Sequence, residues 1–436
     1  MTLRTAGNPS LRVHAVFLFC LLADCGRVGA PPQRFSFDDS AHEYVRLAVA
    51  LGERDPDAVD FYDGPKEWVS DVRQRPPALA QIRSSASDAI GRLTRLSAIQ
   101  PDDQVRQHFL LGQLRAIGAR ADLLLGIERT FDQETAAFFG IQLTPRADGR
   151  SKAVRSELAR LLTGKGRLVD RYAIFDGKFR VPPERLPAVM DRALKACRDQ
   201  TLAHLTLPPD EKVSIEYVRN KAWSAYSYYR GDYHSTIQIN TDLPLTVDRA
   251  LRVACHEGYP GHHAFNVLAD QQLVRARKRW EFSVQPTFSP QSLLSEAAAN
   301  IAPDLAFSGA ERIAIERDVL FPLAGLKPAN AERHVAVEQL VETLHPAALA
   351  IARNYLDGKL DFARAARAFE DQALMAHPEA TLRYLNEFRT YVVTYTEGQD
   401  RLAQWLDSRA AQRHDSEGRW GAFRELIAAP DLFLAR

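Results

Sequence analysis

Cysteine, net charge and long apolar runs are all scarce in this sequence of 436 residues. Four cysteines are too few for a disulfide framework, and a chain of this length does not need one to fold. The 56 Lys and Arg nearly cancel the 55 Asp and Glu, so no basic field favours nucleic acid as a partner. Hydrophobic residues make up 46% and charged residues 25%, which are the proportions of a soluble globular protein.

A short apolar run near the N-terminus has the layout of a secretory signal. Arg4 and Arg12 precede the run Val13–Leu22, and the small-residue stretch Val28–Ala30 follows it. The run is shorter than the roughly 20 residues that a membrane-spanning helix needs. We therefore predict a signal peptide over residues 1–30 and export to the periplasm or out of the cell.

The cysteines give two further expectations. Leu22–Cys25 is similar to a lipoprotein acceptor site, the alternative to a cleaved signal, although Asp24 stands where a small residue is expected. Removal of the signal leaves Cys197 and Cys255. We expect Cys255 to pack on a helix as a free, small hydrophobe rather than to act as a thiol ligand.

Most of the remaining chain has the apolar periodicity of amphipathic helices, and prolines separate the periodic segments. A serine cap at Ser40 is expected to begin the first helix. We predict a mainly α protein, one large helical domain over residues 31–436, with an N-terminal helical part to about residue 205 and a metal-site part from about 210. The expected helices lie within residues 40–51, 88–96, 104–127, 186–197, 246–255, 360–375, 380–395 and 399–406.

Two segments before the central motif alternate with period two instead. Val213–Val218 and Ser235–Asn240 predict a small antiparallel β element. The aromatic stretch Trp223–Tyr233 lies between them and is expected to wall a cleft. An edge strand at Ser235–Asn240 would be able to bind an extended peptide by β-augmentation.

The motif that carries chemistry begins at His256 and Glu257 and continues to His262 and His263. A hydrolytic zinc site needs about three protein ligands, an open position for water and a carboxylate base. In a continuous helix, residue i+6 points away from residue i, and residue i+7 lies about 10 Å along the axis. Pro260 breaks the helix ladder, so a local bulge would bring His262 to His256.

Metal binding explains this segment better than packing does. Gly and Pro inside a helix cost roughly 1 and 3 kcal/mol, and a purely structural segment gains nothing from them. We predict His256 and His262 as metal ligands and Glu257 as the general base, with His263 as the alternative second ligand.

The segment His256–His263, with the sequence His-Glu-Gly-Tyr-Pro-Gly-His-His, resembles the signature of a bacterial family catalogued as domain of unknown function 885. That family is grouped with helical zinc peptidases whose third ligand is a glutamate. The stretches Leu47–Pro56 and Tyr395–Gly398 also resemble it, so the likeness extends over Phe35–Leu434.

The resemblance implies a third ligand on a later helix, where Glu296 fits. The family tends to have Glu-Gly-Trp-Ala-Leu-Tyr there, whereas this chain has Glu-Ala-Ala-Ala-Asn-Ile, so its pocket lining differs. Asn300 is expected to orient His256. Tyr395, in the stretch similar to the family, is expected to donate a hydrogen bond to an oxyanion.

These inferences predict an exported zinc-dependent peptidase that acts on a peptide or small amide substrate through metal-activated water. An amidase or esterase acting on a small or cell-wall-derived molecule is one alternative. A secreted helical binding protein with a structural zinc site is another. The sequence does not indicate an oligomeric state.

Overall fold

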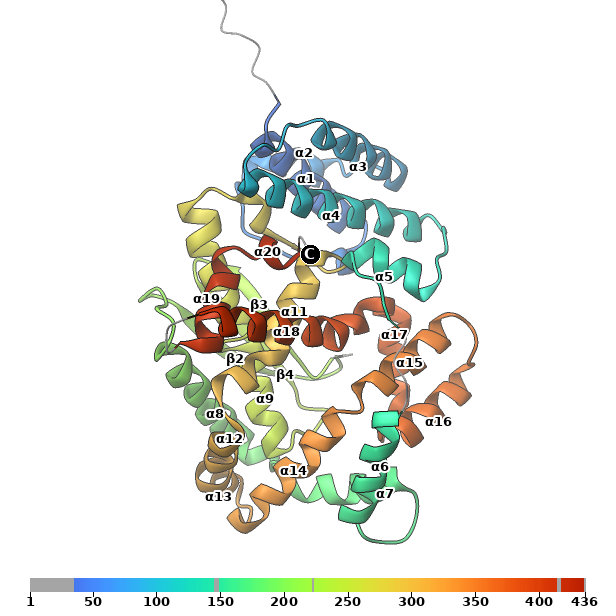
Figure 1. Ribbon diagram of the computed structural model, residues 1–436, viewed down its shortest axis with the longest axis vertical. Helices are drawn as coiled ribbons and strands as arrows, with labels where there is room; N and C mark the ends of the chain where they lie inside the picture. Colours follow the sequence, from blue (N-terminus) through green and yellow to red (C-terminus); the bar gives the residue numbers. More distant parts are fainter. Residues whose placement is uncertain (1–34, 145–148, 222, 414–416, 435–436) are drawn as a thin grey trace, which may run out of the picture. The chain divides into compact units, whose positions relative to one another are not determined.

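The computed structural model describes residues 35–144, 149–221, 223–413 and 417–434 (Figure 1). The predicted signal peptide and the acceptor site around Cys25 lie outside the described residues. Ser36–Arg436 forms one compact unit, and the predicted mainly α fold is confirmed. No described helix is both long enough and apolar enough to cross a bilayer.

The N-terminal helices pack on one another, and the first begins earlier than expected. Ser36, not Ser40, caps α1, because its hydroxyl accepts from the backbone N–H of Asp39 while the Asp39 carboxylate accepts from that of Ser36. This layer contains α1 (Phe37–Gly52), α2 (Ser70–Gln74), α3 (Leu79–Thr94), α4 (Pro101–Leu124) and α5 (Phe131–Phe139). The next helices are α6 (Gly149–Leu161), α7 (Leu168–Asp176) and α8 (Leu186–Leu202).

More helices follow the strands. One of them, α11 (Pro290–Ala306), packs against α9 (Val247–Glu257), α18 (Glu397–Gln412) and α4 (Figure 1). Nearly every residue of α11 is buried, and its run Ala297–Ala299 lets neighbouring helices approach closely. The helices are α9 (Val247–Glu257), α10 (His262–Ala269), α11 (Pro290–Ala306), α12 (Gly309–Ile315), α13 (Phe321–Ala324), α14 (Ala331–Glu342), α15 (His345–Leu356), α16 (Phe362–Ala373), α17 (Pro378–Phe388), α18 (Glu397–Gln412), α19 (Gly418–Ala428) and α20 (Asp431–Leu434).

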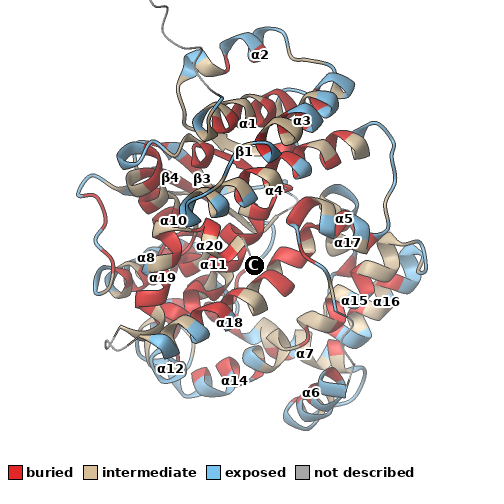
Figure 2. Cartoon of the chain, turned by 45° about the horizontal axis from the view of Figure 1, so that its top comes forward, coloured by how far each residue is buried: buried red, intermediate tan, exposed pale blue. Residues whose placement is uncertain are grey.

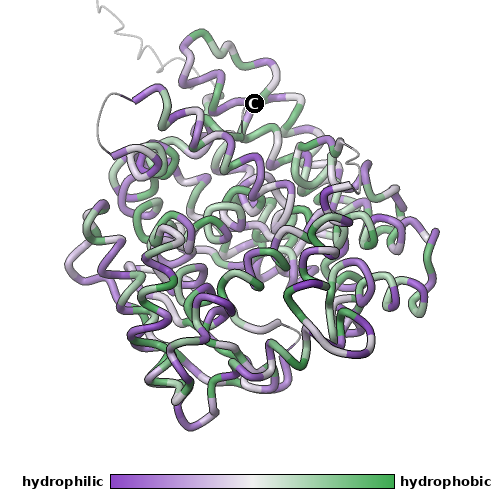
Figure 3. Tube along the Cα trace, turned by 60° about the horizontal axis from the view of Figure 1, so that its bottom comes forward, coloured by the Kyte–Doolittle hydropathy of each residue, from purple (hydrophilic) through white to green (hydrophobic). Residues whose placement is uncertain are grey.

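Burial follows the hydropathy of the helices. Buried residues line the inward faces of α1, α4 and α11 (Figure 2), and apolar and polar stretches alternate along the trace (Figure 3). One large core cluster joins α8, α9, α11 and α18, and a second lies among α1, α3 and α4. The amphipathic periodicity in the sequence therefore identified the faces that pack.

The strand segments predicted from the sequence form, but their pairing differs from the expectation. β2 (Lys212–Val218) pairs in parallel with β4 (His234–Asn240), and β3 (Ala225–Gly231) pairs antiparallel with β4. Most of the aromatic stretch between β2 and β4 thus forms a third strand, which is joined to β4 by a two-residue turn in which Asp232 and Tyr233 both have positive φ.

This topology contradicts β-augmentation at Ser235–Asn240. The sheet order is β2-β4-β3, so β4 is the central strand and both of its edges are already hydrogen-bonded. A second sheet pairs β1 (Val59–Tyr62) antiparallel with β5 (Val284–Pro286). The sequence did not predict this sheet, because its two strands are very short.

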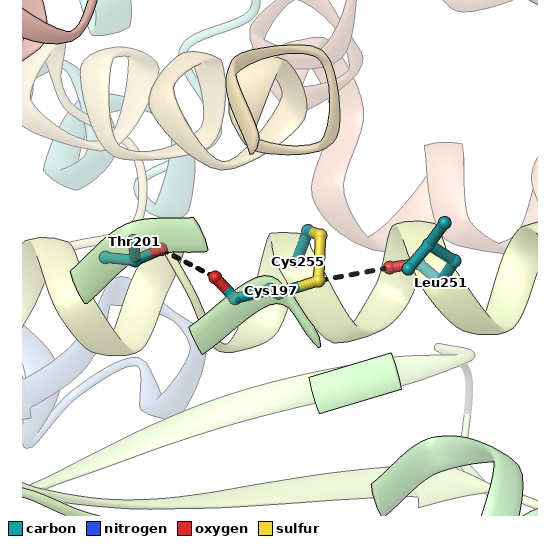
Figure 4. The surroundings of a disulfide bond; sticks show 4 residues. All are labelled: Cys197, Thr201, Leu251 and Cys255. Carbon is teal, nitrogen blue, oxygen red and sulfur yellow. Dashed lines mark hydrogen bonds between the residues drawn. A yellow bond between two sulfur atoms is a disulfide. The ribbon is translucent and has the colours of Figure 1, made fainter. Parts of the chain in front are cut away.

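A disulfide bond joins Cys197 on α8 to Cys255 on α9 (Figure 4). The expectation that Cys255 is free was therefore wrong. The two helices pack side by side and bring the two Cα atoms to 5.4 Å, a separation suited to a disulfide. A sequence separation of 58 residues gave no indication of this proximity.

Candidate metal centre

The two motif histidines lie on two successive helices. The Thr246 side chain caps the start of α9, and His256 and Glu257 occupy its last turn. α10 then begins at His262. The predicted break near Pro260 is confirmed, although two separate helices replace the single bulged helix that we expected.

The loop over residues 258–261 folds back over the end of α9. The backbone N–H of Gly261 donates a hydrogen bond of 3.1 Å to the carbonyl oxygen of Cys255. A methyl group on Gly261 would overlap the carbonyl oxygen of His256, so the loop needs glycine at this close approach. The loop thereby places His262 beside His256, which a continuous helix does not do.

His256, His262 and Glu296 lie together with the spacing of metal ligands. Nε2 of His256 is 3.6 Å from Oε2 of Glu296, and Nε2 of His262 is 3.5 Å from Oε1 of the same carboxylate. The centroids of the two imidazole rings are 4.9 Å apart. Donor atoms about 2.0–2.2 Å from one tetrahedral ion lie roughly 3.4 Å from one another, which is close to the separation of each imidazole nitrogen from one oxygen of Glu296.

One oxygen of Glu296 tests whether an ion fits here. Oε2 is buried and has no hydrogen-bond partner within the described structure, and it faces the His256 ring. A buried polar atom without a partner is destabilising and needs an explanation. A divalent cation among His256, His262 and Glu296 would satisfy it, so the residues present fit a metal ion.

Glu257 lies beside these three side chains. Its Oε1 is 4.0 Å from Nε2 of His256, and the ligand atoms of His256, Glu257 and His262 all lie within 4.8 Å of one another. The 4.0 Å between Glu257 and His256 exceeds the distances of 3.6 and 3.5 Å from Glu296 to the two rings. Burial raises the pKa of Glu257 to about 7, which suits a carboxylate that accepts and returns a proton near neutral pH.

The charges of the three candidate ligands are unequal. Burial, followed by the charge on His262, lowers the pKa of His256 to about 3. Burial also disfavours charge on His262, but Glu296, Glu257 and Asp60 outweigh it and raise its pKa to about 9. Burial opposes ionisation of Glu296 as well, yet its histidine neighbours lower its pKa. Without an ion, the positive charge of a protonated His262 therefore neutralises the negative charge of Glu296.

Two side chains that we did not predict hold the ligands in place. The Tyr391 hydroxyl donates to Oε1 of Glu296 at 2.8 Å and accepts from the Ser292 hydroxyl at 3.1 Å. Oγ of Ser295 lies 3.3 Å from Nδ1 of His262. Such outer contacts orient metal ligands. The sequence places Ser292 and Ser295 just before Glu296, but it gave no signal for Tyr391.

Asn300 does not have the expected role. Its side-chain nitrogen is buried and makes no hydrogen bond in the part of the chain that the structure describes. Asn300 lies one turn after Glu296 on the same face of α11. Only Glu296 of these two residues has a described contact with the His256 ring. A one-turn spacing was therefore insufficient evidence that Asn300 contacts the ligand.

Removing the Tyr391 hydroxyl is expected to weaken metal binding about 10- to 100-fold, because Glu296 loses the hydrogen bond that fixes its Oε1. Competition between the Tyr391→Phe variant and a coloured chelator measures this. Tyr395→Phe is the matched control, since the Tyr395 hydroxyl contacts that of Tyr384 at 3.1 Å instead. Equal loss of affinity in both variants would contradict the assignment.

His263, the alternative ligand, points away from the centre. Its ring is fully buried, with Nδ1 2.8 Å from Oγ of Ser235 and Nε2 2.9 Å from Oε2 of Glu211. This Ser-His-Glu row resembles a hydrolytic triad in outline. Because Ser235 is only 3% exposed, no substrate reaches it, and the row anchors α10 to β4.

A cavity of about 450 Å³ contains the candidate centre, a volume within the range of ligand pockets. Part of the predicted aromatic wall is confirmed, because Trp223, Tyr226 and Tyr228 line the cavity. Tyr229 lies on the opposite face of β3 and donates a hydrogen bond to Asp270. Tyr395 also lines the cavity, but its hydroxyl pairs with that of Tyr384 and not with a candidate metal ligand among the described residues.

Asp60 is a cavity residue that sequence reasoning missed. It lies on β1 and accepts a hydrogen bond from the Tyr226 hydroxyl. Burial raises its pKa to about 6. The segment before β1 is fixed by a buried ion pair of 2.6 Å between Asp55 and Arg120. Asp55 is the last residue but one of the stretch Leu47–Pro56. Its ion pair therefore holds the start of β1, which carries Asp60.

The comparisons with known proteins support the fold alone. No protein-family model and no curated protein matches the chain. The structure described as "the putative lipoprotein from Colwellia psychrerythraea" is 12% identical with a TM-score of 0.53, covering 93% of this chain and 76% of that one. A structure from Shewanella oneidensis, described as "a putative lipoprotein of unknown function", is 10% identical with a TM-score of 0.48, covering 82% and 72%. The Colwellia structure shares the helical fold, and the family resemblance stays a prediction.

Proposed function

We propose that this chain is a metal-dependent hydrolase, a zinc peptidase with His256, His262 and Glu296 as ligands and Glu257 as general base. The observation that carries the proposal is the unpartnered Oε2 of Glu296 beside the His256 ring, with Oε1 beside the His262 ring and the carboxyl of Glu257 next to His256. Imidazole and carboxylate ligands favour zinc among abundant divalent ions.

The residues of the chain have separable tasks in this proposal. Zinc, when bound, supplies a Lewis acid that lowers the pKa of water at its open position to about 7. Glu257 takes the proton of the attacking water and passes it to the leaving amine. Tyr395 lines the cavity and is the residue we propose to donate a hydrogen bond to the oxyanion.

Export is part of the proposal. A disulfide such as Cys197–Cys255 persists in oxidising compartments and is rare in the cytosol of mesophiles. The Colwellia protein of similar fold is described as a putative lipoprotein, which agrees with an exported chain. Sequencing the N-terminus of the mature protein would distinguish a cleaved signal near residue 30 from lipidation at Cys25.

The deciding experiment combines elemental analysis of the purified protein with a cleavage screen. A peptide library is digested in parallel with ester and small-amide panels, before and after chelation and again after Zn²⁺ is restored. We expect peptide cleavage that chelation removes and Zn²⁺ restores. Cleavage confined to esters or small amides would favour the amidase alternative. Stoichiometric metal with no hydrolysis in any panel would favour a binding protein.

Metal binding is expected to release about one proton per chain at pH 7 from His262. Its pKa of about 9 keeps it protonated, whereas His256, with a pKa of about 3, is already neutral. A metal ligand must be deprotonated, so the affinity should rise about tenfold per pH unit from neutral pH towards 9 and level off above it. Calorimetry in buffers of different ionisation enthalpy measures the release.

Glu257 also titrates near neutral pH, so the proton count is cleanest in the Glu257→Gln variant. There the released proton comes from His262 alone. The charge of Glu257 no longer raises the pKa of His262, so the release should fall towards zero at a lower pH than in the wild type. A pH-independent affinity of the wild type between 7 and 9 would show that His262 is not a ligand.

A further inference from the structure

A second group of potential metal ligands lies away from the candidate centre, between α7 and α14. It consists of Asp176 at the end of α7 and the pair His334 and Glu338 on α14. Residues i and i+4 of a helix share one face, so both α14 side chains point towards Asp176. One ligand atom from each residue lies within 4.8 Å of the other two.

His334 lacks the hydrogen bonds that a buried imidazole requires. It is fully buried, and neither of its ring nitrogens has a hydrogen-bond partner within the described structure. Nε2 lies 4.0 Å from Oδ1 of Asp176 and 3.9 Å from Oε1 of Glu338. Both separations are too long for hydrogen bonds. Leaving a buried polar group without a partner is destabilising, so something is expected to stand between these atoms.

Aromatic side chains fix the His334 ring. It stacks on Phe179 with a centroid distance of 4.1 Å, and Phe321 approaches at 6.0 Å. The ring is thus held with Nε2 towards the two carboxylates. Glu338 is held in turn by the Tyr172 hydroxyl, which donates to Oε2 at 2.9 Å. This is the kind of outer support that orients metal ligands.

The carboxylates also need a cation. No Lys or Arg forms an ion pair of 4.0 Å or less with Glu338 or Asp176 among the described residues. The Asp176 side chain is 25% exposed, so an ion from solvent can reach the group. Donor atoms about 2.1 Å from one tetrahedral ion lie roughly 3.4 Å apart, so each of the two carboxylate oxygens needs to approach Nε2 of His334 by only about half an ångström.

We propose that Asp176, His334 and Glu338 form a second divalent transition-metal site, with a structural role. Nitrogen and carboxylate ligands together suit Zn²⁺ or Mn²⁺ better than Mg²⁺ or Ca²⁺. The ion clamps α7 to α14. α14 in turn supports the metal-binding helix, because its Glu342 forms an ion pair with Arg252 of α9.

The test uses the full chain with the first centre removed by His256→Ala and His262→Ala. We expect this double variant to keep about one Zn²⁺ or Mn²⁺ per chain after desalting and to gain thermal stability when the metal is added. Adding Asp176→Asn should lower the remaining affinity at least about tenfold and remove the thermal shift. Asp176 is partly exposed, so this substitution leaves the core packing intact.

Asp170→Asn, at an exposed position on the same helix, is the matched control and should change neither readout. Glu338→Gln provides a second ligand variant and should behave like Asp176→Asn. The inference is overturned if the double variant binds no metal, or if Asp176→Asn binds it as tightly as Asp170→Asn does. Neither result depends on peptide cleavage, so this test and that of the proposed function fail separately.

Discussion

Replacing Glu257 with Gln is expected to lower turnover about 10²- to 10⁴-fold while the metal stays bound. The amide keeps the shape of the side chain but cannot accept the proton of the attacking water. The carboxyl is suited to this role because burial raises its pKa to about 7, and because it lies 4.0 Å from the proposed ligand His256. Single-turnover rates and elemental analysis of the same preparation measure both quantities.

Glu387→Gln is the matched control for this experiment. Glu387 also lines the cavity but forms no ion pair with His256 or His262 in the described part of the chain. Its variant should stay within about threefold of the wild type, as expected for a carboxylate outside the reacting geometry. Full activity of Glu257→Gln with metal bound would remove Glu257 as the base. Loss of the metal would instead identify Glu257 as a ligand.

The local part of the candidate site was predictable from the sequence. The motif His256–His263 contains both histidines and the base, and Pro260 with two glycines indicates a break that folds the second histidine back. The structure brings His256 and His262 together in this way. Glu296 was placed by family resemblance, and its two carboxylate oxygens lie 3.6 Å from Nε2 of His256 and 3.5 Å from Nε2 of His262.

Residues that reach the site from distant segments were not predictable. Tyr391 contacts Glu296 across 95 positions of sequence, and Asp60 lies on a four-residue strand with little periodicity. Tyr395 was preferred because it belongs to a stretch that resembles the family. In the structure it is Tyr391, also in the 3₁₀ segment Arg389–Tyr395, whose hydroxyl donates to Glu296. Helical periodicity extended through this segment does not distinguish the two tyrosines.

Helices were predicted better than strand pairing, for a physical reason. The apolar face of a helix is encoded within its own residues, so α8, α9 and α16 appear close to their predicted positions. The partner of a strand is chosen by tertiary packing. The alternation in β2 and β4 therefore identified both strands but not their parallel pairing or the insertion of β3.

Removing the disulfide is expected to lower the free energy of unfolding by about 2–4 kcal/mol. A bond between residues separated by 58 positions restricts the unfolded chain strongly, and loop-closure entropy alone gives about 4 kcal/mol. The double variant Cys197→Ser with Cys255→Ser leaves no stray thiol. Denaturant unfolding of metal-free protein measures the change without a contribution from the ion.

The same bond should also affect the metal centre. Cys255 precedes His256 directly, and the bond ties the end of α9 to α8, so its loss should loosen the last turn, which carries the proposed ligand and the proposed base. Metal affinity of the double variant should therefore fall together with its stability. A reducing agent provides the control, because it should shift the wild type to the unfolding midpoint of the variant and leave the variant unchanged. Identical midpoints for oxidised wild type and double variant would mean that packing alone holds α8 to α9.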